Sequence, residues 1–220
     1  MKCALAKHGQ NSMANKARSA KEHKIRTRGW FSISDRPGDR TFSQQVEGLD
    51  PMFGEVHGKA VLDVGCAEGL IALHCATVGA RRVDGIEIVP GHIEIALRLR
   101  EEYERYECSF FVADANEYSP ARKYDIVLML AVLHKLREPA KACERIAMQC
   151  TDLCVIRLGP DALERIVDER SNKVTQQIGE VMRGIGFEME RMKRGPFDEA
   201  TFYYRRRNGT AWRDLGSWAA

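Results

Sequence analysis

Acidic residues and glycines gather where the apolar runs of this chain end. Asp63 lies inside the run 60–64, which breaks at Gly65 and resumes as a helical pattern after Gly69. A buried strand that turns through glycines into a helix presents backbone N–H groups beside an open pocket. Glu87 ends the next apolar run, and a carboxylate there suits the vicinal hydroxyls of a ribose. Together these residues predict a site for a nucleotide-like cofactor.

The glycine spacing narrows the choice of cofactor. The dehydrogenase turn has the pattern G-x-G-x-x-G, but the residue two after Gly65 is Ala67 and the residue three further on is Leu70. The pattern therefore fails at two of its three glycines, and strand-Asp-x-Gly-x-x-x-Gly remains. A tight strand-to-helix connection without any ligand is the plain alternative for this turn.

Strands and helices alternate regularly after this turn. The expected strands are 60–64, 81–87, 109–113, 124–130 and 152–158, and the expected helices are 70–78, 90–106, 139–149 and 172–183. Continuous apolar strands separated by helices indicate a parallel sheet that is covered on both faces. The last two strands, 187–192 and 201–207, are joined by a turn too short for a parallel crossover, so they should pair antiparallel.

The motif and the antiparallel end together resemble the class I S-adenosylmethionine-dependent methyltransferases. The resemblance covers about residues 59–207 and implies an α/β fold, a mostly parallel seven-stranded doubly wound sheet with an antiparallel C-terminal hairpin. It also implies S-adenosyl-L-methionine as cofactor and S-adenosyl-L-homocysteine as product. The family positions that it assigns to cofactor binding are Asp63, Gly65, Cys66, Ala67, Gly69, Glu87, Ile88, Asp114, Ala115 and Leu130.

Several of these positions inherit a specific role from the family. Glu87 would bind the two ribose hydroxyls, and Ile88 would pack on the adenine. Asp114 would accept from the adenine amino group while the backbone N–H of Ala115 reaches the ring. Asp63 would orient the loop by accepting from backbone N–H groups. The plain alternative for Asp114 is a turn or helix cap.

The methyl acceptor is marked less clearly. The loop after the strand 124–130 lacks the [DNS]-P-P-[YFW] motif of exocyclic-amine enzymes and the Pro-Cys pair of pyrimidine C5 enzymes. Its Leu133-His134-Lys135-Leu136 stretch resembles the exit loop of small-molecule methyltransferases. His134 is the candidate general base, because imidazole titrates near neutral pH. A cap on the following helix is the alternative, and the other histidines show no metal-ligand spacing, so we expect no metal.

Three segments differ in composition. Residues 1–28 hold eight basic residues against one acidic residue and few bulky apolar ones, which predicts a flexible basic tail. Residues 29–58 are apolar enough to form a cap that supplies part of the substrate pocket, interrupted by a turn at 36–40. Residues 59–220 form the cofactor-binding domain. The candidate substrate residues in the cap are Trp30, Arg36, Arg40 and Phe42.

These features favour an enzyme that methylates O, N or C of a small-molecule acceptor. An RNA or other nucleic-acid methyltransferase that uses the basic tail is the first alternative. A non-catalytic protein that uses the same fold for interaction is the second. Use of a modified S-adenosylmethionine, such as a carboxylated form held by Arg36 and Arg40, also stays open. No apolar run is long enough to span a membrane and the seven cysteines form no CxxC pair, so we expect a cytoplasmic protein with reduced cysteines.

Overall fold

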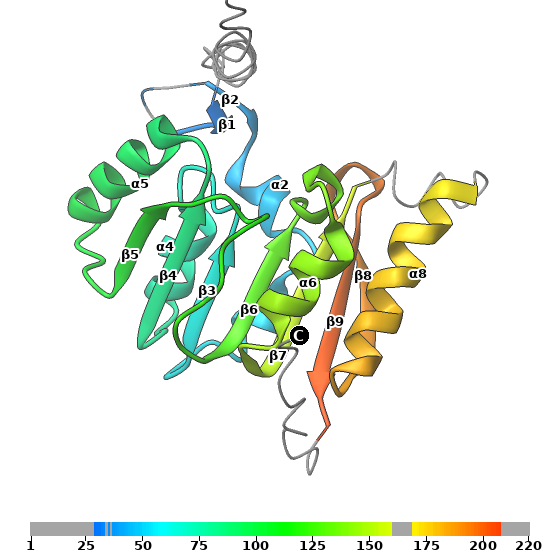
Figure 1. The fold of residues 1–220 in the computed structure, drawn as a ribbon. Coiled ribbons are helices and arrows are strands. Elements are labelled where there is room, and N and C mark those ends of the chain that lie inside the picture. Colours follow the sequence, from blue (N-terminus) through cyan, green and yellow to red (C-terminus); the bar gives the residue numbers. More distant parts are fainter. Residues whose placement is uncertain (1–28, 34, 36, 160–168, 208–220) are drawn as a thin grey trace, which may run out of the picture.

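A seven-stranded sheet forms the centre of the computed structural model, which describes residues 29–33, 35, 37–159 and 169–207 (Figure 1). The strand order is β5-β4-β3-β6-β7-β9-β8. All neighbouring strands pair parallel except β9, which is antiparallel to both β7 and β8. The strands are β3 (Ala60–Val64), β4 (Arg82–Glu87), β5 (Cys108–Val112), β6 (Tyr124–Leu130), β7 (Cys150–Leu158), β8 (Phe187–Arg194) and β9 (Ala200–Arg206). The predicted fold and its antiparallel hairpin are confirmed.

Helices cover both faces of this sheet. The helices are α2 (Phe42–Val46), α3 (Asp50–Phe53), α4 (Leu70–Thr77), α5 (Pro90–Glu102), α6 (Pro139–Ala147) and α8 (Glu169–Gly184), with 3-10 turns η1 (Leu133–Lys135) and η2 (Pro196–Asp198). One hydrophobic cluster joins the sheet to α2 through α5, and a second joins it to α6 and α8. In β3, Val61 belongs to the first cluster and Leu62 to the second, so successive side chains enter opposite cores.

The chain before β3 folds differently from the prediction. Residues 38–40, expected to be part of a turn, form strand β2 (Gly38–Arg40), which pairs parallel with β1 (Gly29–Phe31). Two short helices, α2 and α3, follow β2. Thr41 begins α2 with a capping box, because its hydroxyl accepts from the Gln44 N–H and the Gln44 side chain accepts from the Thr41 N–H.

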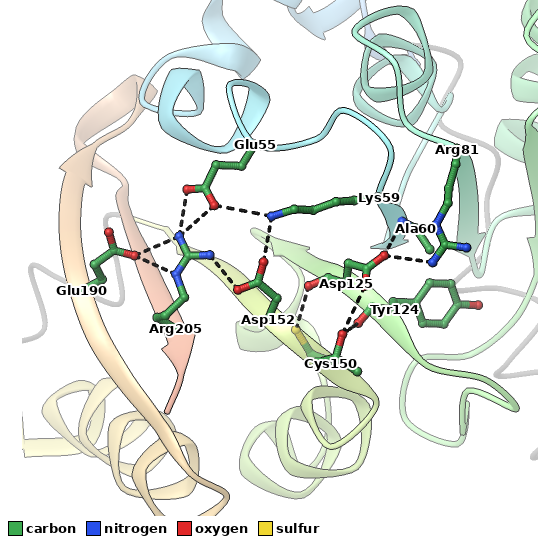
Figure 2. Close-up of polar contacts among 11 residues, drawn as sticks. Glu55, Lys59, Ala60, Arg81, Tyr124, Asp125, Cys150, Asp152, Glu190 and Arg205 are labelled. Carbon is green, nitrogen blue, oxygen red and sulfur yellow. Dashed lines mark hydrogen bonds and ion pairs between the residues drawn. The ribbon is translucent and has the colours of Figure 1, made fainter. Parts of the chain in front are cut away.

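The amino ends of the parallel strands carry a network of ion pairs, which we call the amino-edge network (Figure 2). Its members are Glu55, Lys59, Asp152, Glu190 and Arg205. The Arg205 guanidinium donates to Glu55 at 2.8 Å, to Asp152 at 2.8 Å and to Glu190 at 3.1 Å. Lys59 donates to Asp152 at 2.7 Å. The network therefore ties β7, β8 and β9 to the segment that precedes β3.

Disulfides, membrane-spanning helices and metal-binding clusters are all absent from the residues that the structure describes. The six described cysteines are free and buried, as expected for reduced core residues. Within the described residues, no helix combines the length and apolar character needed to cross a bilayer. No group of three or more histidine, cysteine or carboxylate side chains suited to a metal ion occurs in the ranges that the structure describes.

Candidate functional site

A cleft of about 320 Å³ opens at the carboxyl ends of β3, β4, β5 and β6. This is the edge at which open parallel sheets bind ligands. The cleft is lined by Trp30, Gly65, Ala67, Ile86, Glu87, Ile88, Val89, His92, Ala113, Asp114, Ala115, Asn116, Leu130, Ala131, Val132, Lys135 and Leu136. Seven of the ten predicted cofactor residues line it. The other three, Asp63, Cys66 and Gly69, lie behind its wall.

The two glycines of the turn have different roles. Gly65 has a φ of 75°, and a β-carbon there would approach the Val132 side chain to 3.0 Å, so the absent side chain keeps the cleft floor open. Gly69 starts α4 in the left-handed region, and a β-carbon there would meet the Phe110 ring at 2.8 Å. The absent side chain of Gly69 therefore allows close packing beneath the loop, and its cofactor contact stays a prediction.

Cys66 is also a packing residue here. Its side chain is buried, with Sγ 3.7 Å from the Ala67 carbonyl oxygen. Burial, together with the nearby carboxylates of Asp63 and Glu87, raises the pKa of the Cys66 thiol well above its ordinary value. The thiol therefore stays protonated at neutral pH and is not a nucleophile.

Two alanines in the cleft wall have strained backbones. Ala67 has a φ of 49° and Ala131 a φ of 53°, in the left-handed region that glycine adopts more easily. Both residues line the cleft; Ala67 lies in the loop after β3, and Ala131 lies in the loop after β6. Backbone strain of this kind is concentrated at functional sites, where the surrounding structure maintains it.

Glu87 organises the loops around the cleft. One carboxylate oxygen accepts from the N–H groups of Ile88 at 2.7 Å and Val89 at 3.0 Å, and the other accepts from the Ala67 N–H at 3.2 Å. The side chain thus joins the loop after β3 to the loop after β4. Its position at the end of β4 is the one predicted for the ribose contact.

Asp63 does not hold the loop as predicted. Its side chain is 2% exposed, and among the described residues no hydrogen bond to its carboxyl group is found. One N–H of that loop, from Ala67, is bonded to Glu87. Burial, and secondarily the charge of Glu87, raises the pKa of Asp63 to about 7. With Glu68 also fully buried nearby, this edge of the sheet favours a cationic ligand.

Asp114 begins a loop that a helix supports from behind. Its Oδ1 accepts from both the backbone N–H and the side-chain amide of Asn116, at 2.8 Å each. Asp114 therefore stabilises a local turn, as in the plain alternative, and also lines the cleft. Arg145 on α6 donates to the carbonyl groups of Ala115, Asn116 and Tyr118 at 2.7–2.9 Å. Nothing in the sequence marks Arg145 as a site residue, because a basic residue on an amphipathic helix normally indicates a solvated face.

His92 lines the cleft, although no motif in the sequence marks it. It lies in the first turn of α5, and its Nε2 is 3.6 Å from the Glu68 carboxylate. Its Nδ1 is buried and has no hydrogen-bond partner within the described ranges. A buried polar atom without a partner is costly unless a ligand or water satisfies it. The orphaned nitrogen, the Glu87 carboxylate and the open floor at Gly65 fit a polar, ribose-bearing ligand.

Of the predicted substrate residues that the structure describes, only Trp30 lines the cleft. The Arg40 guanidinium lies 5.0 Å from the Trp30 ring and pairs with Glu199 through two hydrogen bonds, at 2.8 and 3.0 Å. Lys135 lies on the ring at 4.5 Å. Phe42 packs against the His74 ring on α4, away from the cleft, and Arg36 lies outside the described residues.

His134, the predicted general base, is exposed in η1 and is not among the residues that line the cleft. Its ring lies near Gly159, 3.7 Å from the place where a β-carbon of that residue would be. The flanking residues Val132, Lys135 and Leu136 do line the cleft. The catalytic role of His134 stays a prediction.

Comparisons with known proteins agree with this geometry. Residues 61–151 match a methyltransferase domain family. Ribosomal protein L11 methyltransferase from Burkholderia multivorans is 39% identical over 71 residues, which are 32% of this chain and 22% of that protein. Ubiquinone biosynthesis O-methyltransferase from Acinetobacter baylyi is 30% identical over 134 residues, 58% of this chain and 56% of that protein. The chain thus spans about half or less of the length of these relatives.

A solved structure extends the comparison to the whole sheet. Magnesium protoporphyrin IX methyltransferase from Synechocystis, determined with S-adenosylmethionine bound, superposes with a TM-score of 0.59 at 21% sequence identity. The match covers 73% of this chain and 78% of that one. At this level of identity the likeness establishes the fold.

Proposed function

We propose that this protein, a class I S-adenosylmethionine-dependent methyltransferase by sequence and fold, transfers a methyl group to O, N or C of a small-molecule acceptor. The observation that carries the proposal is the single cleft that unites the glycine turn at Gly65, the carboxylates of Glu87 and Asp114, and Leu130. These residues come from four strand ends that are far apart in the sequence.

Each residue of the cleft would contact a different part of the cofactor. S-adenosylmethionine supplies an electrophilic methyl group on a positively charged sulfur. Glu87 would accept from the ribose hydroxyls, and Ile88, which is 42% exposed, would pack on the adenine. Asp114 and the Ala115 N–H would bind the polar edge of that ring. Methyl transfer then depends mainly on placing the acceptor in line, an effect of proximity and orientation.

A small acceptor fits the remaining wall of the cleft. That wall is formed by Trp30, Val132, Lys135 and Leu136, so it is mostly apolar with one aromatic ring. Of the relatives, the ubiquinone enzyme carries a small-molecule acceptor in its name and matches over the longer part of this chain. The alternative of a nucleic-acid acceptor depends on the tail 1–28, which lies outside the described residues.

Calorimetric titration with S-adenosylmethionine, S-adenosylhomocysteine and NAD tests the cofactor assignment directly. We expect saturable binding of the first two and none of the third. Binding of NAD alone, or of none of the three, would contradict the proposal. Methylation of a panel of phenols, amines and carboxylic acids by the full chain would then identify the acceptor.

The general base is tested separately by His134→Ala. If His134 removes the acceptor proton, the rate at neutral pH should fall by roughly 10²–10⁴ while cofactor affinity stays within about twofold. An unchanged rate would assign proton removal to another group or show that in-line placement suffices.

A further inference from the structure

Glu68 is a buried carboxylate in the middle of the cofactor loop. It follows Ala67, which lines the cleft, and precedes Gly69, which starts α4, and its side chain is 0% exposed. Burying a carboxylate is costly unless hydrogen bonds satisfy it. Its partners should therefore reveal why this loop contains an acid.

Those partners are the backbone of β1. Oε1 accepts from the Trp30 N–H at 2.8 Å, and Oε2 accepts from the Phe31 N–H at 3.1 Å. Strand β1 has three residues and pairs only with β2 among the described strands, so the carboxylate is its direct polar link to the core. His92, from α5, is the third group beside Glu68. One side chain thus contacts two pieces of the cleft wall, the strand that carries Trp30 and the helix that carries His92.

We infer that Glu68 is a positioning residue that holds Trp30 against the cleft and couples the cofactor loop to the acceptor side. The coupling rests on the proposed function, whereas the hold on Trp30 does not. A ligand that orders the loop at Ala67 also fixes Glu68, and Glu68 fixes the backbone that carries the Trp30 ring. Loss of the carboxylate frees both N–H groups and lets the ring leave the cleft.

Tryptophan fluorescence tests the hold on Trp30 without any ligand. The chain has three tryptophans, so replacing Trp212 and Trp218 by Phe leaves Trp30 as the only one. In that background Glu68→Gln should raise the acrylamide quenching constant of Trp30 by about twofold or more, because the amide presents a donor to one of the two N–H groups. The matched control is Glu94→Gln, which removes an exposed carboxylate on α5. Equal quenching in both variants would overturn the inference.

Hydrogen exchange of the unmodified protein tests the link between Glu68 and β1 even if the Glu68→Gln variant does not fold. The amides of Trp30 and Phe31 should exchange far more slowly than exposed amides, and exchange at the rate of exposed amides would refute the link to Glu68. Calorimetry with S-adenosylhomocysteine then tests the coupling. Glu68→Gln should weaken binding by about tenfold, and Trp30→Ala should add little to that loss.

Fully additive losses would disprove the coupling. If the unmodified protein does not bind S-adenosylhomocysteine at all, the proposed function fails. Quenching and exchange would still decide whether Glu68 holds Trp30.

Discussion

The two edges of the parallel sheet differ in how their carboxylates are paired with basic side chains. At the amino edge, every carboxylate of the amino-edge network faces Lys59 or Arg205 (Figure 2). At the carboxyl edge, burial and, secondarily, the charge of Glu87 raise the pKa of Asp63, and the His92 imidazole lies 3.6 Å from the Glu68 carboxylate. The carboxylates of the amino edge are thus paired with basic side chains, whereas Asp63, Glu68 and Glu87 at the carboxyl edge have no lysine or arginine partner among the described residues.

The pKa shifts at the two edges make the free energy of unfolding depend on pH in opposite directions. Asp63 titrates near 7 in the folded protein, above its usual 3.8, so stability falls as pH rises from about 4 to 7. At Asp152, burial favours a higher pKa, but hydrogen bonds from Lys59 and Arg205 outweigh it and lower the value. The stability that Asp152 contributes is present above its unfolded pKa and is lost as pH falls through its folded pKa.

The largest effect is expected from Asp63→Asn. The isosteric amide removes the charge that burial makes costly, so the free energy of unfolding at pH 8 should rise by about 4 kcal/mol. Urea denaturation at pH values from 4 to 8 measures it, and the slope between 4 and 7 should flatten. The matched Asp152→Asn should instead lower stability at pH 8. An unchanged slope in Asp63→Asn would mean that Asp63 is ionised throughout.

Glu87→Ala should act mainly on ligand binding. Losing the two hydrogen bonds expected with the ribose should weaken S-adenosylhomocysteine binding by about 150-fold or more, because bonds to charged groups contribute about 1.5–3 kcal/mol each. Removing the Glu87 charge should also lower the pKa of Asp63 and reduce its pH slope. Calorimetry measures the first effect and urea denaturation the second. Wild-type affinity in this variant would contradict the ribose contact.

Arg205→Met should affect stability and leave ligand binding unchanged. It removes the shared partner of Glu55, Asp152 and Glu190, and we expect a loss of about 1–2 kcal/mol in the free energy of unfolding. Affinity for S-adenosylhomocysteine should stay within about twofold. A large loss of affinity would show that the two edges of the sheet are coupled, and the contrast between them would fail.

The smallest effect is expected from Arg145→Lys. A single ammonium group cannot reach all three carbonyl groups that the guanidinium binds behind the Asp114 loop. Loss of one or two such bonds should weaken S-adenosylhomocysteine binding about fivefold. Lys141→Arg, at an exposed position on the same helix, is the control. Unchanged binding would show that the loop holds its shape without Arg145.

The sheet could be predicted because its signals are local. The run Tyr124–Leu130 has the same bounds in the prediction and in the structure, since a short and nearly continuous apolar stretch is typical of a buried parallel strand. The three-residue strands β1 and β2 could not, because they are too short for any periodicity. Gly38 also begins β2 in a stretch whose composition favours a turn.

The site was predicted only where a motif marks it. Gly65, Glu87 and Asp114 follow strand ends, and all three line the cleft. Glu68 and Arg145 act on backbone groups that are about 30 or more residues away, and no spacing in the sequence reveals such a pairing. Asp63 lies at the predicted strand end, but the spacing in the sequence does not reveal that Glu87 accepts from the Ala67 N–H of the loop.

The raised pKa of Asp63 has a calorimetric consequence. A cation that binds beside an acid with a pKa of about 7 favours its ionised form, so binding near neutral pH expels a proton. The heat of binding S-adenosylmethionine should then depend on the ionisation enthalpy of the buffer, while that of the uncharged thioether product should depend on it less. Binding of the sulfonium and protonation of Asp63 would thus compete, and Asp63 would take up a proton from solution when the uncharged thioether product leaves.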